Sequence, residues 1–385
     1  MPDRLLPLHT IKDLGYYFNA RGELRTIEGD EPFKFTTQEE YEVLGDAMTH
    51  EIYNLMEKVG LQRILLKKPI DSKPDDHYSF VFASPDFHEK QTLLILIHGM
   101  GAVRAGQWTR KLILNESLDR GSQLPYIERA LTNGWGVLVT NANLNEHYFG
   151  ECSISQPLQY SKSPENHMES VWYRFVRYTK AQNIFVVAHS RGGHDISNVM
   201  ETFSDENRVS CICLTDSWFE FPQNREQQPI VINWAARNKA SVRRSLTGKS
   251  AHENRVHQIW AGTNEHERSS YCALESIFFV LEHNPCEENI EQLLSDAWDI
   301  MDAPQLEVET DSFGQPRQKI TNIISKDEEG NVKVNEDLFA VDGLAKPEET
   351  AKGDCADGEE NIELVRSGDE VDLEPCAKQP RLVEN

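Results

Sequence analysis

Short apolar runs and stretches of helical periodicity alternate between residues 78 and 282. The first kind are continuous apolar runs, which is typical of strands buried on both faces of a sheet. They are YSFVFA (78–83), TLLILIH (92–98), GVLVTN (136–141), NIFVVAH (183–189), VSCICLTD (209–216) and VHQIWAG (256–262). Stretches with apolar residues at helical spacing lie at 124–134, 164–182, 192–203 and 270–282. This alternation predicts an α/β fold: a mostly parallel sheet of about six strands with helices on both faces.

The first 70 residues carry a different pattern, a hairpin followed by an amphipathic helix. GYYFNARGELRTI alternates around a turn that contains Gly22, which predicts a β-hairpin. Thr37, followed three residues later by Glu40, forms a capping box ahead of apolar residues at helical spacing. Gly60 suits the end of that helix. We therefore expect residues 1–70 to form an N-terminal module packed on the main domain.

Acidic residues are concentrated at the C-terminal end of the chain. The chain has 63 Asp and Glu against 39 Lys and Arg, a formal charge of −24. Residues 301–385 hold 22 acidic and 9 basic side chains, and apolar periodicity fades after Trp298. This predicts a main domain over residues 71–300 and a disordered acidic tail over 301–385. Because an acidic surface repels phosphate, we expect RNA to be bound only indirectly or weakly.

The cysteines and the lack of long apolar runs indicate the cellular compartment in which we expect the protein. The seven cysteines are scattered and include no C-x-x-C pair, which is typical of free thiols in a reducing compartment. No apolar run approaches the roughly 20 residues that cross a bilayer. The first residues lack the apolar core of a secretory signal. We expect a soluble nuclear or cytosolic protein with no membrane contact.

The segment NIFVVAHSRGGHDISNVM has the strand–turn–helix pattern of a nucleophile elbow. Ser190 is the candidate nucleophile, and Ala188 stands where the first glycine of G-x-S-x-G usually lies. Residues two before and two after the serine must be small because neighbouring backbones pass close, and Ala188 and Gly192 satisfy this need. We expect His189 to pack beside the nucleophile and Gly193 to continue the turn. The alternative is a plain strand–turn–helix junction whose serine caps the helix.

A second glycine-containing turn, HGMG at 98–101, follows an earlier apolar strand. It resembles the HGGG-type loop of lipases and esterases, which supplies backbone amides to an oxyanion hole. We predict that the amides of Gly99 or Met100, together with that of Arg191, form such a hole. The alternative is an ordinary glycine-rich turn between a strand and a helix.

A serine nucleophile needs a base, and the base needs an acid that orients it. Asp216 ends the first strand after the elbow, and His266 follows the last strand. With Ser190 they occur in the chain order of α/β-hydrolases, each just past the carboxyl end of a strand. We therefore predict that these three residues form a catalytic triad. Asp195 and Glu265 remain as rival acids.

The sequence predicts no cofactor and no metal site. Neither G-x-x-x-x-G-K-[ST] nor G-x-G-x-x-G occurs, so nucleotide binding is not expected. We expect the sulfurs of Cys211 and Cys213 to lie on opposite faces of a strand. His252 and His257 lack the companions that a zinc site requires. The basic run from Arg237 to Lys249 is expected to be a solvated loop, with contact to RNA or to an acidic partner as the alternative.

Taken together, these motifs resemble the Argonaute-binding-protein-two (Arb-two) domain family, and most closely its animal branch of cotranscriptional regulators. The resemblance rests on the hairpin with EPFKF, the HGMG loop, the AHSRGG elbow and the WAGTNEHE segment, and it covers roughly residues 10 to 285. It implies an α/β-hydrolase fold and a proposed hydrolase activity with Ser190 as the nucleophile. One departure is Arg191 directly after the nucleophile, which argues against an apolar substrate pocket there.

The resemblance also implies partners and a biological role. Argonaute-class, chromatin and splicing proteins are the expected partners, in the nucleus and the cytoplasm. The corresponding role is cotranscriptional regulation linked to the siRNA pathway, heterochromatin formation and alternative splicing, with possible serine hydrolase activity. The alternative hypothesis is a catalytically active serine esterase, thioesterase or amidase with no regulatory role.

Overall fold

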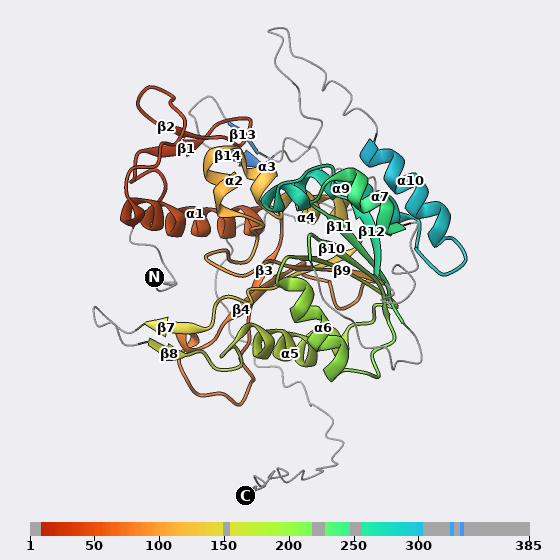
Figure 1. Cartoon of the computed structure of the whole chain (residues 1–385). Coiled ribbons are helices and arrows are strands. Elements are labelled where there is room, and N and C mark those ends of the chain that lie inside the picture. The colour runs from red at the N-terminus through yellow and green to blue at the C-terminus, as the bar shows by residue number, and fades with distance from the viewer. Residues whose placement is uncertain are drawn as a thin grey trace, which may run out of the picture. The chain divides into compact units, whose positions relative to one another are not determined.

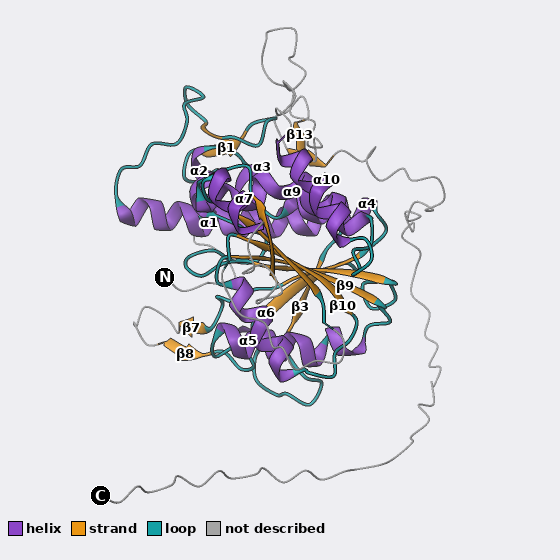
Figure 2. Ribbon diagram, turned by 45° about the vertical axis from the view of Figure 1, so that its right-hand side comes forward, coloured by secondary structure: helices purple, strands orange, loops and turns teal. Residues whose placement is uncertain are grey.

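An eight-stranded sheet with helices on both faces forms the centre of the protein (Figures 1 and 2). The computed structural model describes residues 9–148, 155–217, 228–246, 256–302, 324–326 and 332–334. The strands of the sheet are β3 (Gln62–Leu65), β4 (Phe80–Ala83), β5 (Thr92–Ile97), β6 (Gly136–Val139), β9 (Asn183–His189), β10 (Val209–Thr215), β11 (Ile230–Ala235) and β12 (Val256–Trp260). Their spatial order is β12-β11-β10-β9-β5-β6-β4-β3. Strand β4 runs opposite to the other seven strands, so the sheet is mostly parallel, as the sequence predicts.

Two layers of helices cover the two faces of the sheet, as Figure 2 shows above and below the strands. On one face lie α5 (Pro164–Arg174) and α6 (Gly192–Thr202), and the other face is covered by α1 (Gln38–Lys58), α4 (Leu124–Thr132), α9 (Ser269–Glu282) and α10 (Ile290–Asp302). Along β5, Leu94 and Leu96 join the core under α1, whereas Leu93 and Ile95 join the core under α5. Since successive strand residues point to opposite faces, a continuous apolar run is what two cores require.

The predicted N-terminal hairpin and helix are both present. Strands β1 (Tyr16–Phe18) and β2 (Leu24–Thr26) pair antiparallel around Gly22, whose φ of 70° favours glycine. Helix α1 begins after Thr37 and is followed by Gly60, which has a φ of 95°. Buried residues of the hairpin and of α1 belong to the same apolar cluster as one face of the sheet. In addition, β3 belongs to the main sheet although it lies within the first 70 residues.

Removing the cap of α1 is expected to lower the free energy of unfolding by about 1 kcal/mol. The Thr37 hydroxyl accepts a hydrogen bond from the Glu40 amide, one of the donors that the first helical turn leaves unpaired. The measurement is urea denaturation of Thr37→Ala beside the exposed neighbour Gln38→Ala, which should change stability by less than about 0.5 kcal/mol. Equal midpoints for the two variants would contradict a stabilising role for the cap.

The sheet contains two strands that the sequence reading did not identify, β3 and β11. In β11 a buried Asn233 interrupts the apolar run, which obscures the pattern of a central strand. Its side chain accepts from the Ser217 amide at 3.1 Å and donates to Gln258 at 3.0 Å. Burial of this amide is therefore compensated by hydrogen bonds, and the strand keeps its place between β10 and β12.

Two further expectations were wrong. The described part of the basic run includes a helix, α7 (Lys239–Leu246), in place of a loop, and Lys239 forms an ion pair with Asp302. Cys211 and Cys213 share one face of β10, because residues two apart in a strand point the same way. Their sulfurs lie 3.8 Å apart in the core.

The described structure includes a few smaller elements. They are α2 (Arg110–Asn115), α3 (Leu118–Gly121), the pair β7 (Glu146–Tyr148) and β8 (Ser155–Pro157), the pair β13 (Ile324–Lys326) and β14 (Val332–Val334), and the 3₁₀ turns η1 (Asp75–His77), η2 (Val176–Tyr178) and η3 (His266–Arg268). Apart from the end of α10 and the pair β13–β14, the predicted acidic tail lies outside the described residues, and its disorder stays a prediction. No helix in the described ranges is long and apolar enough to cross a membrane.

Candidate active site

Ser190 occupies the sharp turn between β9 and α6, as the elbow pattern predicts. Its φ is 51°, a left-handed conformation that is uncommon for residues other than glycine. Two backbone hydrogen bonds hold the turn: the Ser190 amide donates to the Thr215 carbonyl at 3.1 Å, and the Gly193 amide donates to the Ser190 carbonyl at 3.1 Å. Backbone strain of this kind is concentrated at functional sites, which makes Ser190 a candidate nucleophile on structural grounds.

The glycines around Ser190 are required by close backbone contacts. A Cβ atom on Gly192 would lie 2.8 Å from the Ile97 carbonyl oxygen and 2.9 Å from that of His98. One on Gly193 would lie 2.1 Å from the hydroxyl of Ser217. Ala188 is fully buried in β9, where its small side chain faces the core. Gly192 and Gly193 therefore stand where there is no room for a side chain, and Ala188 is buried as the pattern predicts.

The HGMG turn lies directly against the elbow. A Cβ atom on Gly99 would be 3.1 Å from the Cβ of Ser190. The Gly99 carbonyl accepts hydrogen bonds from His98 Nδ1 at 2.8 Å and from Asn143 Nδ2 at 2.9 Å. Burial lowers the pKa of His98 to about 4, so the ring is neutral at neutral pH and its Nδ1 carries the proton. These bonds fix the turn next to Ser190, while donation by Gly99 or Met100 to an oxyanion stays a prediction.

Asp216 and His266 meet at the carboxyl edge of the sheet. The Asp216 side chain follows β10, and His266 opens η3 after β12. Asp216 Oδ2 lies 2.6 Å from His266 Nδ1, and Asp216 Oδ1 accepts from the Ala236 amide at 3.0 Å. The backbone of Asp216 also has a positive φ, 49°. The carboxylate thus orients the imidazole by its Nδ1, which leaves Nε2 free to act on a substrate or nucleophile.

The pKa values of His266 and Asp216 are shifted in opposite directions by their contact. The hydrogen bond that His266 Nδ1 donates to Asp216 raises the pKa of His266 above its usual value, against a smaller effect of burial. Partial burial works to raise the pKa of Asp216, but the His266 bond and the Ala236 amide outweigh it, and that pKa is lowered. Each partner therefore favours the charged form of the other.

His189 connects the imidazole of His266 to the elbow. The two rings pack against each other with centroids 4.7 Å apart. Burial lowers the pKa of His189 to about 3, and its Nδ1 donates to the Thr215 carbonyl at 3.0 Å. No hydrogen bond joins Ser190 to His266 in this structure. Such bonds are often long in unliganded active sites and form when substrate binds.

The rival acids have other partners. Asp195 is 2% exposed and forms an ion pair with Arg191, whose Nε lies 3.3 Å away. Burial raises the pKa of Asp195 to about 7. Glu265 accepts a hydrogen bond from Arg268 Nε at 3.0 Å. Of the three candidate acids, Asp216 is the one in contact with His266.

Several contacts that support the site were not found from the sequence. Arg191 donates to Glu165 of α5 while pairing with Asp195 of α6, so its side chain ties the elbow to both helices. Arg268 forms an ion pair with Glu116, which anchors the turn that carries His266. Glu116 precedes Arg268 by 152 positions, and no local pattern relates the two. Asn143, which donates to the Gly99 carbonyl, lies in a loop after β6 and has no sequence pattern that marks it.

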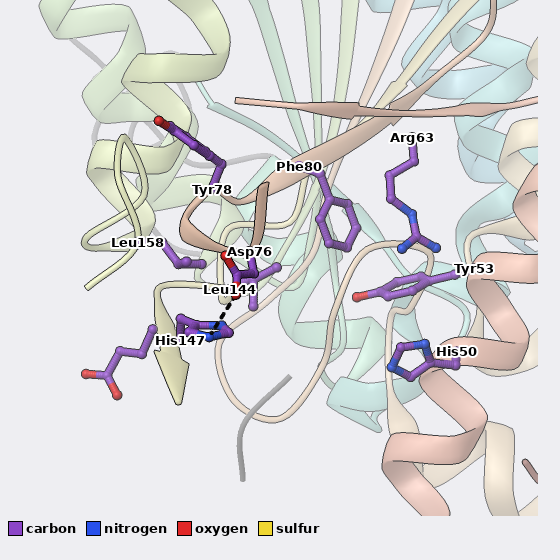
Figure 3. A pocket seen from close by; sticks show the side chains of 10 residues that line it. His50, Tyr53, Arg63, Asp76, Tyr78, Phe80, Leu144, His147 and Leu158 are labelled. Carbon is purple, nitrogen blue, oxygen red and sulfur yellow. Dashed lines mark ion pairs between the residues drawn. The ribbon is translucent and has the colours of Figure 1, made fainter. Parts of the chain in front are cut away.

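A separate cavity lies between α1 and the strand β7 (Figure 3). Its lining residues are His50, Tyr53, Arg63, Asp76, Tyr78, Phe80, Leu144, Glu146, His147 and Leu158. The guanidinium of Arg63 stacks on the rings of Tyr53 and Phe80, and Asp76 forms an ion pair with His147 at 3.5 Å. None of the predicted catalytic residues lines it. Across the described ranges, no group of three or more His, Cys, Asp or Glu is placed to hold a metal ion.

The strand order and the position of the elbow define an α/β-hydrolase fold. Ser190 follows the fifth strand of the sheet in chain order, Asp216 the sixth and His266 the eighth. The second strand, β4, is the one that runs antiparallel to both neighbours. The acid therefore follows the strand directly after the elbow.

Comparison with known proteins identifies the family. The Arb2 domain model matches residues 8–240. The chain is 42% identical over 318 residues to the FAM172 family protein homolog Y75B8A.31 of Caenorhabditis elegans, covering 81% of this chain and 99% of that protein. It is 32% identical over 331 residues to Cotranscriptional regulator ARB2A of Homo sapiens, covering 70% of this chain and 79% of that protein. The chain belongs to the Arb2 domain family, which confirms the resemblance read from its motifs.

Solved structures show more distant likeness. A thermostable esterase is 13% identical with a TM-score of 0.37, covering 60% of this chain and 64% of that chain. The histone deacetylase Clr3 is 14% identical with a TM-score of 0.38, covering 66% of this chain and 41% of that chain. Similarity at this level says nothing about activity.

Proposed function

We propose that this protein is a cotranscriptional regulator with an α/β-hydrolase fold, and that its elbow carries serine-hydrolase chemistry toward an ester, thioester or amide. The observation that carries the chemical part is the 2.6 Å contact between His266 Nδ1 and Asp216 next to the strained turn of Ser190. The regulatory part is supported by relatives that are named cotranscriptional regulators. The two parts have separate tests.

In the proposed reaction, the Ser190 hydroxyl attacks the substrate carbonyl carbon while His266 Nε2 takes its proton. Asp216 keeps the imidazole oriented and stabilises its protonated form. The amides of Gly99 or Met100 and of Arg191 donate to the oxyanion as it forms. His266 then gives the proton to the leaving group. In the second half of the reaction water attacks the acyl carbonyl while His266 takes its proton. That proton passes to Ser190 Oγ as the acyl group leaves as a carboxylic acid.

Labelling with a biotinylated fluorophosphonate tests the chemical part. The reagent phosphonylates activated serines, and peptide mass spectrometry locates the modified residue. We expect the label on the tryptic peptide that contains Ser190, and none on protein that was heat-denatured first. A label on another serine, or no label on the folded protein, would contradict the proposal.

The activity is expected to depend on pH through His266. A general base must be unprotonated, and Asp216 raises the pKa of this imidazole. The rate of labelling should therefore fall as pH drops through a pKa above the usual histidine value of about 6.5. Asp216→Asn removes the stabilising charge, so the residual rate of that variant should decline only at lower pH. Identical pH profiles for the two proteins would show that Asp216 does not control the base.

The regulatory part of the proposal includes location and partners. We place the protein in the nucleus and the cytoplasm, with Argonaute-class, chromatin or splicing proteins as partners, following the family resemblance. The partner surface is expected to lie outside the elbow, so Ser190→Ala should co-purify with its partner as well as the wild type does. Loss of the partner with a folded Ser190→Ala protein would tie regulation to the catalytic site. The absence of any such partner would favour the alternative of an enzyme without a regulatory role.

A further inference from the structure

A row of aromatic side chains crosses the surface between the N-terminal hairpin and the start of α1. Strands β1 and β2 of the hairpin lie at upper left in Figure 1, above helix α1. Ring centroids are 6.2 Å apart for Tyr16 and Phe33, 6.3 Å for Phe33 and Tyr41, and 6.0 Å for Tyr41 and Phe35. The first three are half-buried against the main core, whereas Phe35 is 61% exposed and nearby Ile27 is 49% exposed. We call these five residues the aromatic row. It presents apolar groups to solvent from a firmly packed base.

Four of the five residues of the aromatic row lie in an acidic segment of the chain. Residues 27–42 contain six acidic side chains and one lysine, a net charge of −5. The acidic residues are Glu28, Asp30, Glu31, Glu39, Glu40 and Glu42. Within the described part of the chain, Glu31 is the one of these six that forms an ion pair, 3.6 Å from Lys34. We call these six carboxylates the rim. An exposed apolar strip in so acidic a segment favours a partner that covers the strip and carries positive charge.

Three kinds of partner bury exposed aromatic groups, and the charge decides between them. Single-stranded nucleic acid stacks its bases on aromatic rings, but its backbone needs a positive groove and would be repelled here. An anionic membrane surface is repelled for the same reason. A protein segment that carries both basic and bulky apolar side chains can cover the aromatic row and pair with the carboxylates at the same time.

We propose that the aromatic row is a docking surface for a cationic protein segment, with Phe35 and Ile27 receiving its apolar side chains and the rim carboxylates pairing with its lysines and arginines. The surface lies on β1, on the segment that joins β2 to α1 and on the first turn of α1, and none of its residues belongs to the candidate active site. The proposal therefore holds or fails independently of the hydrolase chemistry.

The test is fluorescence anisotropy with the full-length protein and a short fluorescein-labelled peptide in which arginine and lysine alternate with leucine and phenylalanine. We expect saturable binding that weakens at least about tenfold in Phe35→Ser, which removes an anchor but no charge. Ile27→Ser should weaken it in the same direction. Tyr178→Ser is the matched control, since that side chain is 67% exposed far along the chain and its loss should leave binding unchanged. Circular dichroism checks that each variant is folded.

Charge is tested separately. The double reversal Glu28→Lys and Glu39→Lys should weaken binding about tenfold and make it less sensitive to salt between about 0.05 and 0.3 M. A peptide with serine in place of leucine and phenylalanine should bind much less. Equal affinity for wild type and Phe35→Ser, or tight binding of the serine peptide, would reduce the interaction to general attraction between opposite charges and overturn the proposal. Tighter binding of a single-stranded oligouridine than of the peptide would also overturn it.

Discussion

Hydrolysis of an activated ester is expected to fall by about 10⁴-fold or more when Ser190 is replaced by alanine. The change removes the oxygen that attacks the substrate, while the left-handed turn and its backbone hydrogen bonds can persist with alanine. Stability should therefore change little, and the loss should appear in kcat. The measurement is steady-state hydrolysis of a nitrophenyl ester by purified wild type and variant. Retained turnover in the variant would assign the chemistry to another residue.

Asp216→Asn should lower the turnover of the same ester by a similar factor, about 10⁴. The amide can still bond to His266 Nδ1, but it no longer stabilises the imidazolium and can select the wrong tautomer. Glu265→Gln is the matched control, because Glu265 was the rival acid and bonds to Arg268 instead. Losing that partly exposed pair should reduce activity by less than about fivefold. A larger loss with Glu265→Gln than with Asp216→Asn would exchange the roles of the two acids.

Gly192→Val is expected to lower the free energy of unfolding by about 3 kcal/mol and to abolish labelling of Ser190. A Cβ at this position meets two backbone carbonyl oxygens at the end of β5, and backbone cannot move aside as a flexible side chain can. Relief of the clash has to separate the elbow from the HGMG turn. The readouts are thermal unfolding and fluorophosphonate labelling.

Gly60→Ala provides the control for this prediction. Gly60 also has a conformational reason to be glycine, with a φ of 95°, but no atom lies within 4 Å of its missing Cβ. Its replacement should cost only about 1 kcal/mol and leave labelling intact. Equal destabilisation by the two variants would show that close packing is not what demands glycine at the elbow.

Features with a local cause were predictable from the sequence. The N-cap Thr37 of α1, the turn glycine of the hairpin and the glycines around Ser190 each follow from constraints that act over a few neighbouring residues. The Glu40 carboxylate, predicted to complete a capping box, bonds to the Thr36 hydroxyl instead. The continuous apolar runs of β5 and β9 likewise predict strands that are buried on both faces of the sheet. Strands β3 and β11 were missed because one is a short edge strand and the other contains a buried asparagine.

The amino-acid pattern alone was enough to predict the α/β class, the elbow with its candidate nucleophile, and the chain order in which an aspartate and a histidine follow it. The contact between Asp216 and His266 became visible only in the folded protein, where Asp195 pairs with Arg191 and Glu265 with Arg268. The same holds for the ion pair between Glu116 and Arg268. Local patterns arise because neighbouring residues share backbone geometry and burial. Which side chains pair at the site depends on which distant segments of the chain meet at one edge of the sheet. The packing of the whole fold sets that arrangement, so a short stretch of sequence does not predict it.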